Sequence, residues 1–141
     1  MNVERLKKLS DHLRNGQLGH DEFDINTYNS SSPSARPQMR KIGCGSSGCA
    51  IGELPIIFPN EWEFRKSTWK EFFDVRLKNS FWERNGMYVT QIEAEEWFDI
   101  GEKKYTRMFM PSSYEPFPTR YDVADRIDQL IKEYESEQCI I

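Results

Sequence analysis

Apolar residues recur at helical spacing close to the start of the chain. Leu6, Leu9 and Leu13 are three and four residues apart, and charged residues fall between them. This spacing brings the leucines onto one face of an α-helix and leaves the charges on the other. The pattern predicts a first amphipathic helix over about residues 2–14, ended by the turn-forming pair Asn15-Gly16.

The most regular stripe of apolar residues lies near the end of the chain. Thr119 is a favourable N-cap residue, and Asp122 would fall in the first turn after it. The stripe then repeats at spacings of four, three, one and three residues, in Val123, Ile127, Leu130, Ile131 and Tyr134. This pattern predicts a helix over about 119–136 with its apolar face buried.

Two further helices are predicted in the middle of the chain. A Thr followed three residues later by Glu precedes apolar residues at Thr68 and again at Thr90. This capping-box pattern predicts helices over 68–78 and 91–99, the second ended near Gly101. The pair Asn85-Gly86 between them is a turn signal that suits one short hairpin.

Prolines among aromatic residues predict an irregular, packed, aromatic-rich connection over 105–118. No alternation of strands and helices is visible along the chain. We therefore predict a mainly α fold, a small single domain spanning residues 1–141 with about four to five helices.

The segment before this helical half has a different character. Residues 26–38 are polar and rich in turn formers, which predicts an exposed, flexible loop. Residues 42–52 concentrate small residues and two of the three cysteines, Cys44 and Cys49. We expect a short helix to begin near Ser46 or Ser47, and Pro55 to end or kink it.

Composition narrows the classes of function. The chain has 141 residues, with 19 basic and 23 acidic side chains and a formal net charge of −4. The basic residues form no run or stripe, which argues against binding of a nucleic acid duplex. No apolar run is long enough to cross a bilayer, and the charged start lacks the apolar block of a signal peptide. We expect no membrane partner and a cytoplasmic location, in a bacterial host cell.

Residues 42–52, which we call the Gly/Cys segment, raise the possibilities of metal binding and of cysteine catalysis. A structural zinc site would need two ligands besides Cys44 and Cys49, and the remaining candidates are distant and unpaired. Cys44-Gly45-Ser46, preceded by Gln38, superficially resembles the motif of papain-like peptidases. Those enzymes need a histidine after the nucleophile, whereas His12 and His20 precede both cysteines. We expect no metal, no cofactor and no catalytic residue.

Anion binding and simple packing are the two remaining interpretations of this segment. Four successive backbone N–H groups at a helix start could bind an anion, with three basic side chains just upstream. The candidate ligand-binding residues are Gly45, Ser46, Ser47 and Gly48, with Arg36, Arg40 and Lys41. The segment matches neither a Walker A loop nor a dinucleotide-binding fingerprint. Alternatively, the small residues allow close packing, and a free cysteine behaves as a small buried hydrophobe.

Acidic and aromatic residues are candidates for a second kind of binding surface. Glu93, Glu95, Glu96 and Asp99 form a cluster whose simplest interpretation is a solvated helix face. The many aromatic residues are core candidates by default. Aromatic residues are also enriched at interfaces, so some are candidates for a pocket or for contacts in a homo-oligomer.

Cys44-Gly45-Ser46 with Cys49-Ala50-Ile51-Gly52 resembles the C-G-[ST]-x-x-C-A-x-G motif of small phage and bacterial proteins of unassigned function. Their later segments E-A-E-x-x-F and T-x-x-x-V-A-x-R-I are similar to residues 93–98 and 119–127 here. Glu53-Leu54-Pro55 departs from the family, whose members tend to continue helically. The resemblance covers most of the chain and implies a phage-encoded or mobile-element accessory protein, without an activity.

The function favoured by these observations is non-catalytic binding of a small ligand. A phage-encoded sponge that sequesters an anionic or nucleotide signal at the Gly/Ser-rich helix start is its most concrete form. The alternative is a protein–protein interaction module, inhibitor-like, that uses exposed aromatic and acidic residues. A cysteine-dependent enzyme is the third hypothesis.

Overall fold

Helices dominate the computed structural model, which describes residues 1–16, 18, 22–23, 30–31, 46–66, 73–79, 87–115 and 118–138. The described part contains five α-helices, which are α1 (Val3–Asn15), α2 (Leu54–Ile57), α3 (Met87–Phe98), α4 (Gly101–Phe109) and α5 (Arg120–Gln138). Single 3₁₀ turns precede α2 and follow α4, at Ile51–Glu53 (η2) and Pro111–Ser113 (η3). The prediction of a mainly α, small single domain is confirmed.

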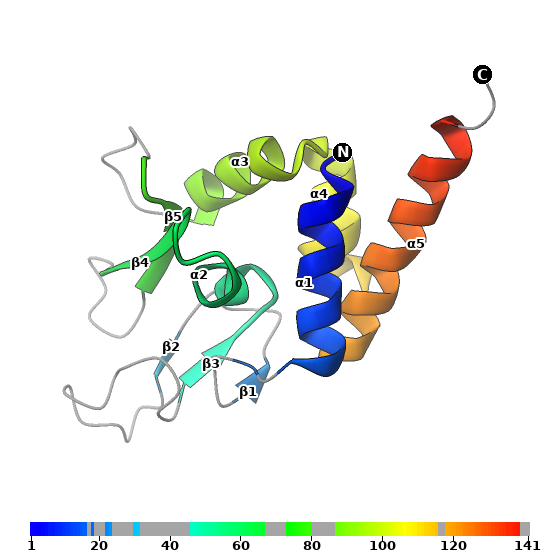
Figure 1. Ribbon diagram of the computed structural model, residues 1–141. Helices are drawn as coiled ribbons and strands as arrows, with labels where there is room; N and C mark the ends of the chain where they lie inside the picture. The colour runs from blue at the N-terminus through cyan, green and yellow to red at the C-terminus, as the bar shows by residue number, and fades with distance from the viewer. Residues whose placement is uncertain are drawn as a thin grey trace.

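Two small sheets lie on the side of α1 away from α5, with α2 between them (Figure 1). Strands β4 (Trp62–Lys66) and β5 (Phe73–Leu77) form an antiparallel pair in which Phe64 is opposite Val75. In the other sheet β3 (Ser46–Gly48) lies between β1 (Glu22–Phe23) and β2 (Ser30–Ser31). β3 is parallel to β1 and antiparallel to β2.

The core forms where α1 lies along α5 (Figure 1). The three leucines of the predicted first helix are completely buried, and α1 begins and ends within about one residue of the expected bounds. The predicted α5 stripe is buried as well, with one exception. Tyr134 is half-buried, and the ammonium of Lys104 lies 5.3 Å from the centroid of its ring.

The prediction of a helix over 68–78 is wrong for residues 73–77, which form strand β5. Thr68 and Glu71 lie outside the described residues. Along β5, the β-branched Val75 is completely buried, while Arg76 reaches a carboxylate of α3. The short hairpin is therefore the β4–β5 pair, and Asn85-Gly86, where we expected it, lies outside the described residues.

The helix predicted over 91–99 begins earlier, at Met87, and ends at Phe98. Thr90 lies inside α3 instead of capping it, and its hydroxyl donates to the carbonyl of Val75 at 2.8 Å. Asp99 then adopts a positive φ of 55° and Gly101 one of 80°. Positive φ values interrupt the α-helix, so the chain changes direction and a new helix starts.

This new helix, α4, corrects the prediction of an irregular connection over 105–118. Residues 105–109 are helical, and Tyr105, Met108 and Phe109 are buried. From Met110 onwards the prediction is confirmed for the residues described, since only the short turn η3 interrupts the irregular chain.

The end of α1 is fixed by a close approach of the chain to itself. A Cβ at Gly16 would lie 2.7 Å from both the carbonyl oxygen and the Nδ1 atom of His12. The guanidinium of Arg120, at the start of α5, donates to the carbonyls of His12, Leu13 and Gly16. The His12 carbonyl also accepts from the N–H of Gly16 at 2.8 Å, and Arg120 adds side-chain donors for the carbonyls at this end of α1.

We expect Ile127→Asp to unfold the protein. Ile127 is completely buried on the side of α5 that faces the core, and an unpaired buried charge costs several kcal/mol. Thermal unfolding followed by circular dichroism checks this result. Ser136→Asp, at an exposed position of the same helix, is the control and should leave the melting temperature nearly unchanged.

Candidate functional site

The Gly/Cys segment does not start a helix where we expected one. Ser46–Gly48 form the middle strand of a sheet and pair with strands on both sides. The helical turns begin only at Ile51. The prediction that Ser46, Ser47 and Gly48 lie at a helix N-terminus is therefore wrong, because a strand paired on both sides directs its N–H groups toward its neighbours.

The other candidate anion ligands, Gly45, Lys41, Arg40 and Arg36, lie outside the described residues. Anion binding by this segment stays a prediction, without the helix N-terminus on which it was based. Pro55 also acts differently from the expectation. It lies in the first turn of α2, where a missing N–H costs nothing, so it opens the helix.

Cys49 is a buried packing residue. It is only 3% exposed and belongs to the core together with Ala50 and Ile51. Burial raises the pKa of its thiol to about 12. A thiol in this environment stays protonated at neutral pH and is a poor nucleophile or metal ligand. Cys44 and Cys139 lie outside the described residues.

His12 contacts a carboxylate instead of a cysteine. Its Nε2 atom lies 2.9 Å from Oε1 of Glu53, whose side chain is 1% exposed. The pair joins α1 to η2, and Glu53 has no exposed surface with which to act on a substrate. This contact gives His12 a packing role.

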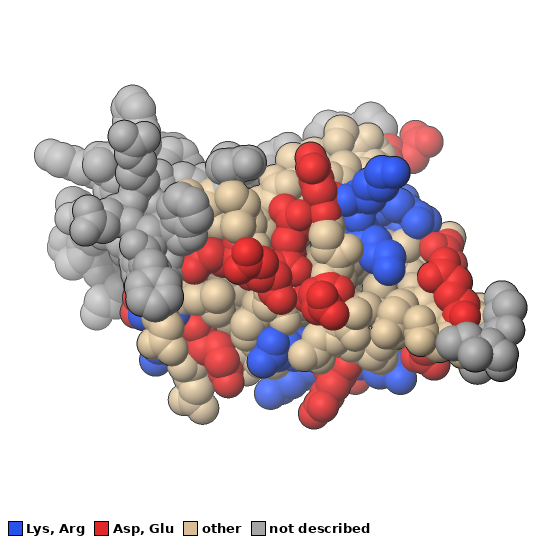
Figure 2. Space-filling view, turned by 90° about the horizontal axis from the view of Figure 1, so that it is seen from above, with Lys and Arg blue, Asp and Glu red and all other residues tan. Residues whose placement is uncertain are grey.

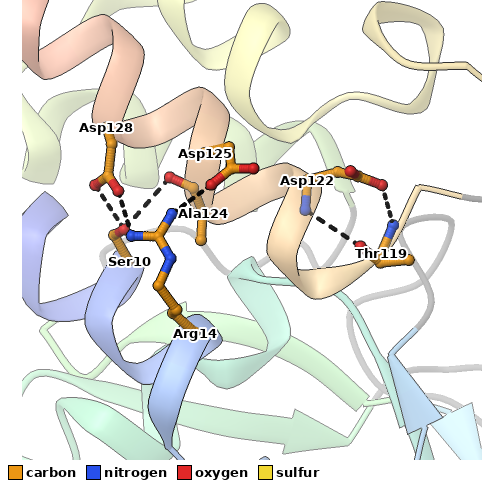
Figure 3. Close-up of polar contacts among 7 residues, drawn as sticks. All are labelled: Ser10, Arg14, Thr119, Asp122, Ala124, Asp125 and Asp128. Atoms are coloured by element: carbon orange, nitrogen blue, oxygen red, sulfur yellow. Dashed lines mark hydrogen bonds and ion pairs between the residues drawn. The ribbon is translucent and has the colours of Figure 1, made fainter.

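A polar seam between α1 and α5 is drawn in Figure 3. Ser10 is completely buried and donates to Oδ1 of Asp128 at 2.7 Å. Arg14 bridges Asp128 and Asp125 with both terminal nitrogens, at 2.5 Å each. Asp128 and then Asp125 raise the pKa of the Arg14 guanidinium. Each of these polar groups has a partner across the seam, so the seam links the two helices.

The start of α5 borders a hollow of about 320 Å³. The predicted cap is confirmed, because the Thr119 hydroxyl accepts from the N–H of Asp122 and the Asp122 carboxylate accepts from the N–H of Thr119 (Figure 3). Arg126, on the wall of the hollow, donates to the carbonyls of Arg107 and Ser113. The side chains of Thr119, Asp122 and Arg126 thus form hydrogen bonds with backbone groups at the ends of helical segments.

A groove of about 370 Å³ lies between the start of α1, the turn after α2 and the end of α3. Asn2 caps α1 by accepting from the N–H of Arg5, while its own N–H donates to the carbonyl of Phe98 at 2.7 Å. These contacts fix the first turn of α1 against the last turn of α3. The groove is lined by Asn2, Glu4, Arg5, Lys8, Phe58, Glu61 and Trp97.

Aromatic rings form the floor of this groove. Phe58 and Trp97 pack edge to face, with centroids 4.7 Å apart. Trp62 packs perpendicular to Trp97 from the core side, at 5.5 Å. Its Nε1 atom is the buried side-chain polar atom without a hydrogen-bond partner in the part of the chain that the structure describes. The floor is therefore a rigid cluster, since each ring is held by the next.

Two cations lie over these rings. The guanidinium of Arg5 is 4.1 Å from the Trp97 centroid and also donates to the Trp97 carbonyl at 2.7 Å. The ammonium of Lys8 is 4.9 Å from the Phe58 centroid. Both distances are typical of cation–π contacts. Glu4 and Glu61 are exposed on the walls of the same groove.

Acidic side chains also gather beside the groove. Figure 2 shows several groups of Asp and Glu side chains across the face of the molecule seen from above. At the junction of α3 and α4 the exposed acidic residues are Glu96, Asp99 and Glu102, which we call the acidic face. Asp99 pairs with the Met1 ammonium at 3.1 Å, next to the first turn of α1. The acidic face therefore borders the groove.

Glu93 departs from the predicted solvated cluster. It is 4% exposed, and its carboxylate lies 2.7 Å from Nε of the completely buried Arg76. No sequence pattern marks this pair, because Arg76 lies on β5 and Glu93 on α3. Glu96 and Asp99 agree with the expectation of a solvated face.

Within the residues that the structure describes, no three His, Cys, Asp or Glu side chains are grouped so that they could hold a metal ion. The same part of the chain contains no helix with the length and apolarity needed to cross a membrane. No protein-family model matches the sequence, and no curated protein or solved structure matches it significantly. The groove and its surroundings are therefore the candidate functional site.

We expect the Cys49 thiol to be protected in the folded protein. Its burial and its raised pKa should make alkylation by iodoacetamide at neutral pH much slower than in denaturant. Mass spectrometry of the Cys49 peptide after timed labelling checks this. Rapid labelling under native conditions would contradict the buried position and reopen a chemical role for this cysteine.

Proposed function

We propose that this protein is a non-catalytic protein–protein interaction module that binds a basic segment of its partner in the groove beside the acidic face. The arrangement of the aromatic floor carries this proposal. Phe58 and Trp97 turn their ring faces toward groove-lining side chains of α1, and the face of an aromatic ring attracts positive charge. Carboxylates at the walls add to that attraction.

Charge complementarity favours a basic partner over an acidic one. The chain has a formal net charge of −4, and the acidic face lies next to the groove. Charges spread over a surface in this way steer an oppositely charged partner and raise its association rate. The groove volume of about 370 Å³ suits a few side chains of a partner.

A role as an accessory protein of a phage or mobile element fits this proposal. The resemblance in the Gly/Cys segment implies such an origin, and an inhibitor-like module would then act on a protein of the bacterial host, in its cytoplasm. Sequestration of a small anionic or nucleotide ligand by residues 45–48 remains the competing hypothesis. Its basic residues, Arg36, Arg40 and Lys41, belong to the part of the chain that is not described.

We expect neutralisation of the groove walls to weaken binding of a basic peptide. The probe is a short synthetic peptide of alternating lysine and glycine, titrated by calorimetry at low salt. Glu4→Gln and Glu61→Gln should each reduce the affinity about two- to fivefold, because exposed charge pairs contribute ~0.2–1 kcal/mol. The reduction should shrink as salt is added.

Glu115→Gln is the matched control. Glu115 is exposed and acidic but borders the other hollow, next to Pro118. An equal loss of affinity for Glu115→Gln and Glu61→Gln would show that only net charge matters and would contradict a specific site. Tight binding of a nucleotide, seen as a raised melting temperature, would instead favour the competing hypothesis.

A further inference from the structure

Lys8 and Arg5 are held in the groove in different ways. Arg5 makes both a ring contact with Trp97 and a hydrogen bond to the Trp97 carbonyl. Lys8 makes only the ring contact with Phe58, and its side chain is exposed. Among the described residues, no carboxylate pairs with the Lys8 ammonium. Arg5 is thus fixed in place, whereas Lys8 can swing into solvent at little cost.

We infer that the Phe58 ring is a cation subsite for the partner, and that Lys8 occupies it only while the groove is empty. In the complex, a lysine or arginine side chain of the partner takes the place of Lys8. This inference rests on the proposed function, since it names the group that the groove recognises. The chemistry is the same before and after the exchange, because one cation replaces another on the same ring.

The surroundings of Phe58 favour an incoming cation. Glu61 follows Phe58 in the same turn, where its N–H donates to the Phe58 carbonyl at 3.2 Å, and its carboxylate lines the groove. Glu4 lines the groove from α1, one helical turn before Lys8. Trp97 supports the ring edge to face at 4.7 Å, so the ring does not need to move when the cation changes.

Removal of the Lys8 side chain should therefore improve binding of the lysine–glycine peptide. Lys8→Ala leaves the ring free, and we expect the affinity to rise about three- to fivefold, the range of an exposed cation–π contact. Calorimetric titration measures the change, and thermal unfolding verifies that the variant is folded.

Lys7→Ala separates this effect from a change in net charge. Lys7 is the neighbouring residue on α1, is exposed and pairs with Glu135 on α5 at 3.7 Å, away from the groove. Lys7→Ala removes one positive charge, as Lys8→Ala does, and should change the affinity for the peptide less than about twofold. In Lys8→Ala/Phe58→Leu, which has no aromatic ring at the subsite, the gain should disappear.

The outcomes separate the inference from the proposed function. A gain with Lys8→Ala that exceeds the gain with Lys7→Ala supports the subsite. Equal effects of the two variants, while Glu61→Gln still weakens binding, overturn the subsite and leave the interaction site standing. Absence of peptide binding to both the wild-type protein and Lys8→Ala overturns the two together.

Discussion

The contact between α1 and α5 is the one on which the rest of the structure depends. Leu6, Leu9 and Leu13 are completely buried, and a buried leucine contributes roughly 2 kcal/mol relative to an exposed one. Ser10 lets the helices approach closely because its small side chain donates to the Ala124 carbonyl. With one face of α1 fixed in this way, its remaining surface and its first turn are free to form a wall of the groove.

The opposite wall depends on a buried ion pair. Arg76 of β5 and Glu93 of α3 attach the β4–β5 hairpin to the helices, next to the hydrogen bond from Thr90 to Val75. Such a pair adds little net stability, because both charges lose their hydration, but loss of one partner would leave an uncompensated charge in the core. Its main effect is therefore positional. It fixes the hairpin that begins at Trp62, beside the turn that carries Glu61.

The elements that could be predicted from the sequence are those with long, uninterrupted stripes. α1 and α5 repeat their apolar residues over several turns, so neighbouring positions reinforce one another. Strand β5 has only five residues, and a capping pattern just before it favoured a helix. Its buried Arg76 requires Glu93, seventeen positions away in the sequence. The groove had no sequence signal, because its walls come from segments whose proximity exists only after folding.

The Gly/Cys segment drew attention because its composition is unusual, yet composition alone does not decide where a protein binds. Ser46–Gly48 form a strand paired on both sides, and Cys49 is enclosed in the core. Small residues of this kind allow chain segments to approach closely, which is an internal use. In the groove, by contrast, Glu4, Lys8 and Glu61 keep their charges at the surface beside a rigid aromatic floor. A binding site needs charged or polar groups that are still accessible to a partner after the chain has folded. Among the described residues, the groove combines such groups with a rigid aromatic floor.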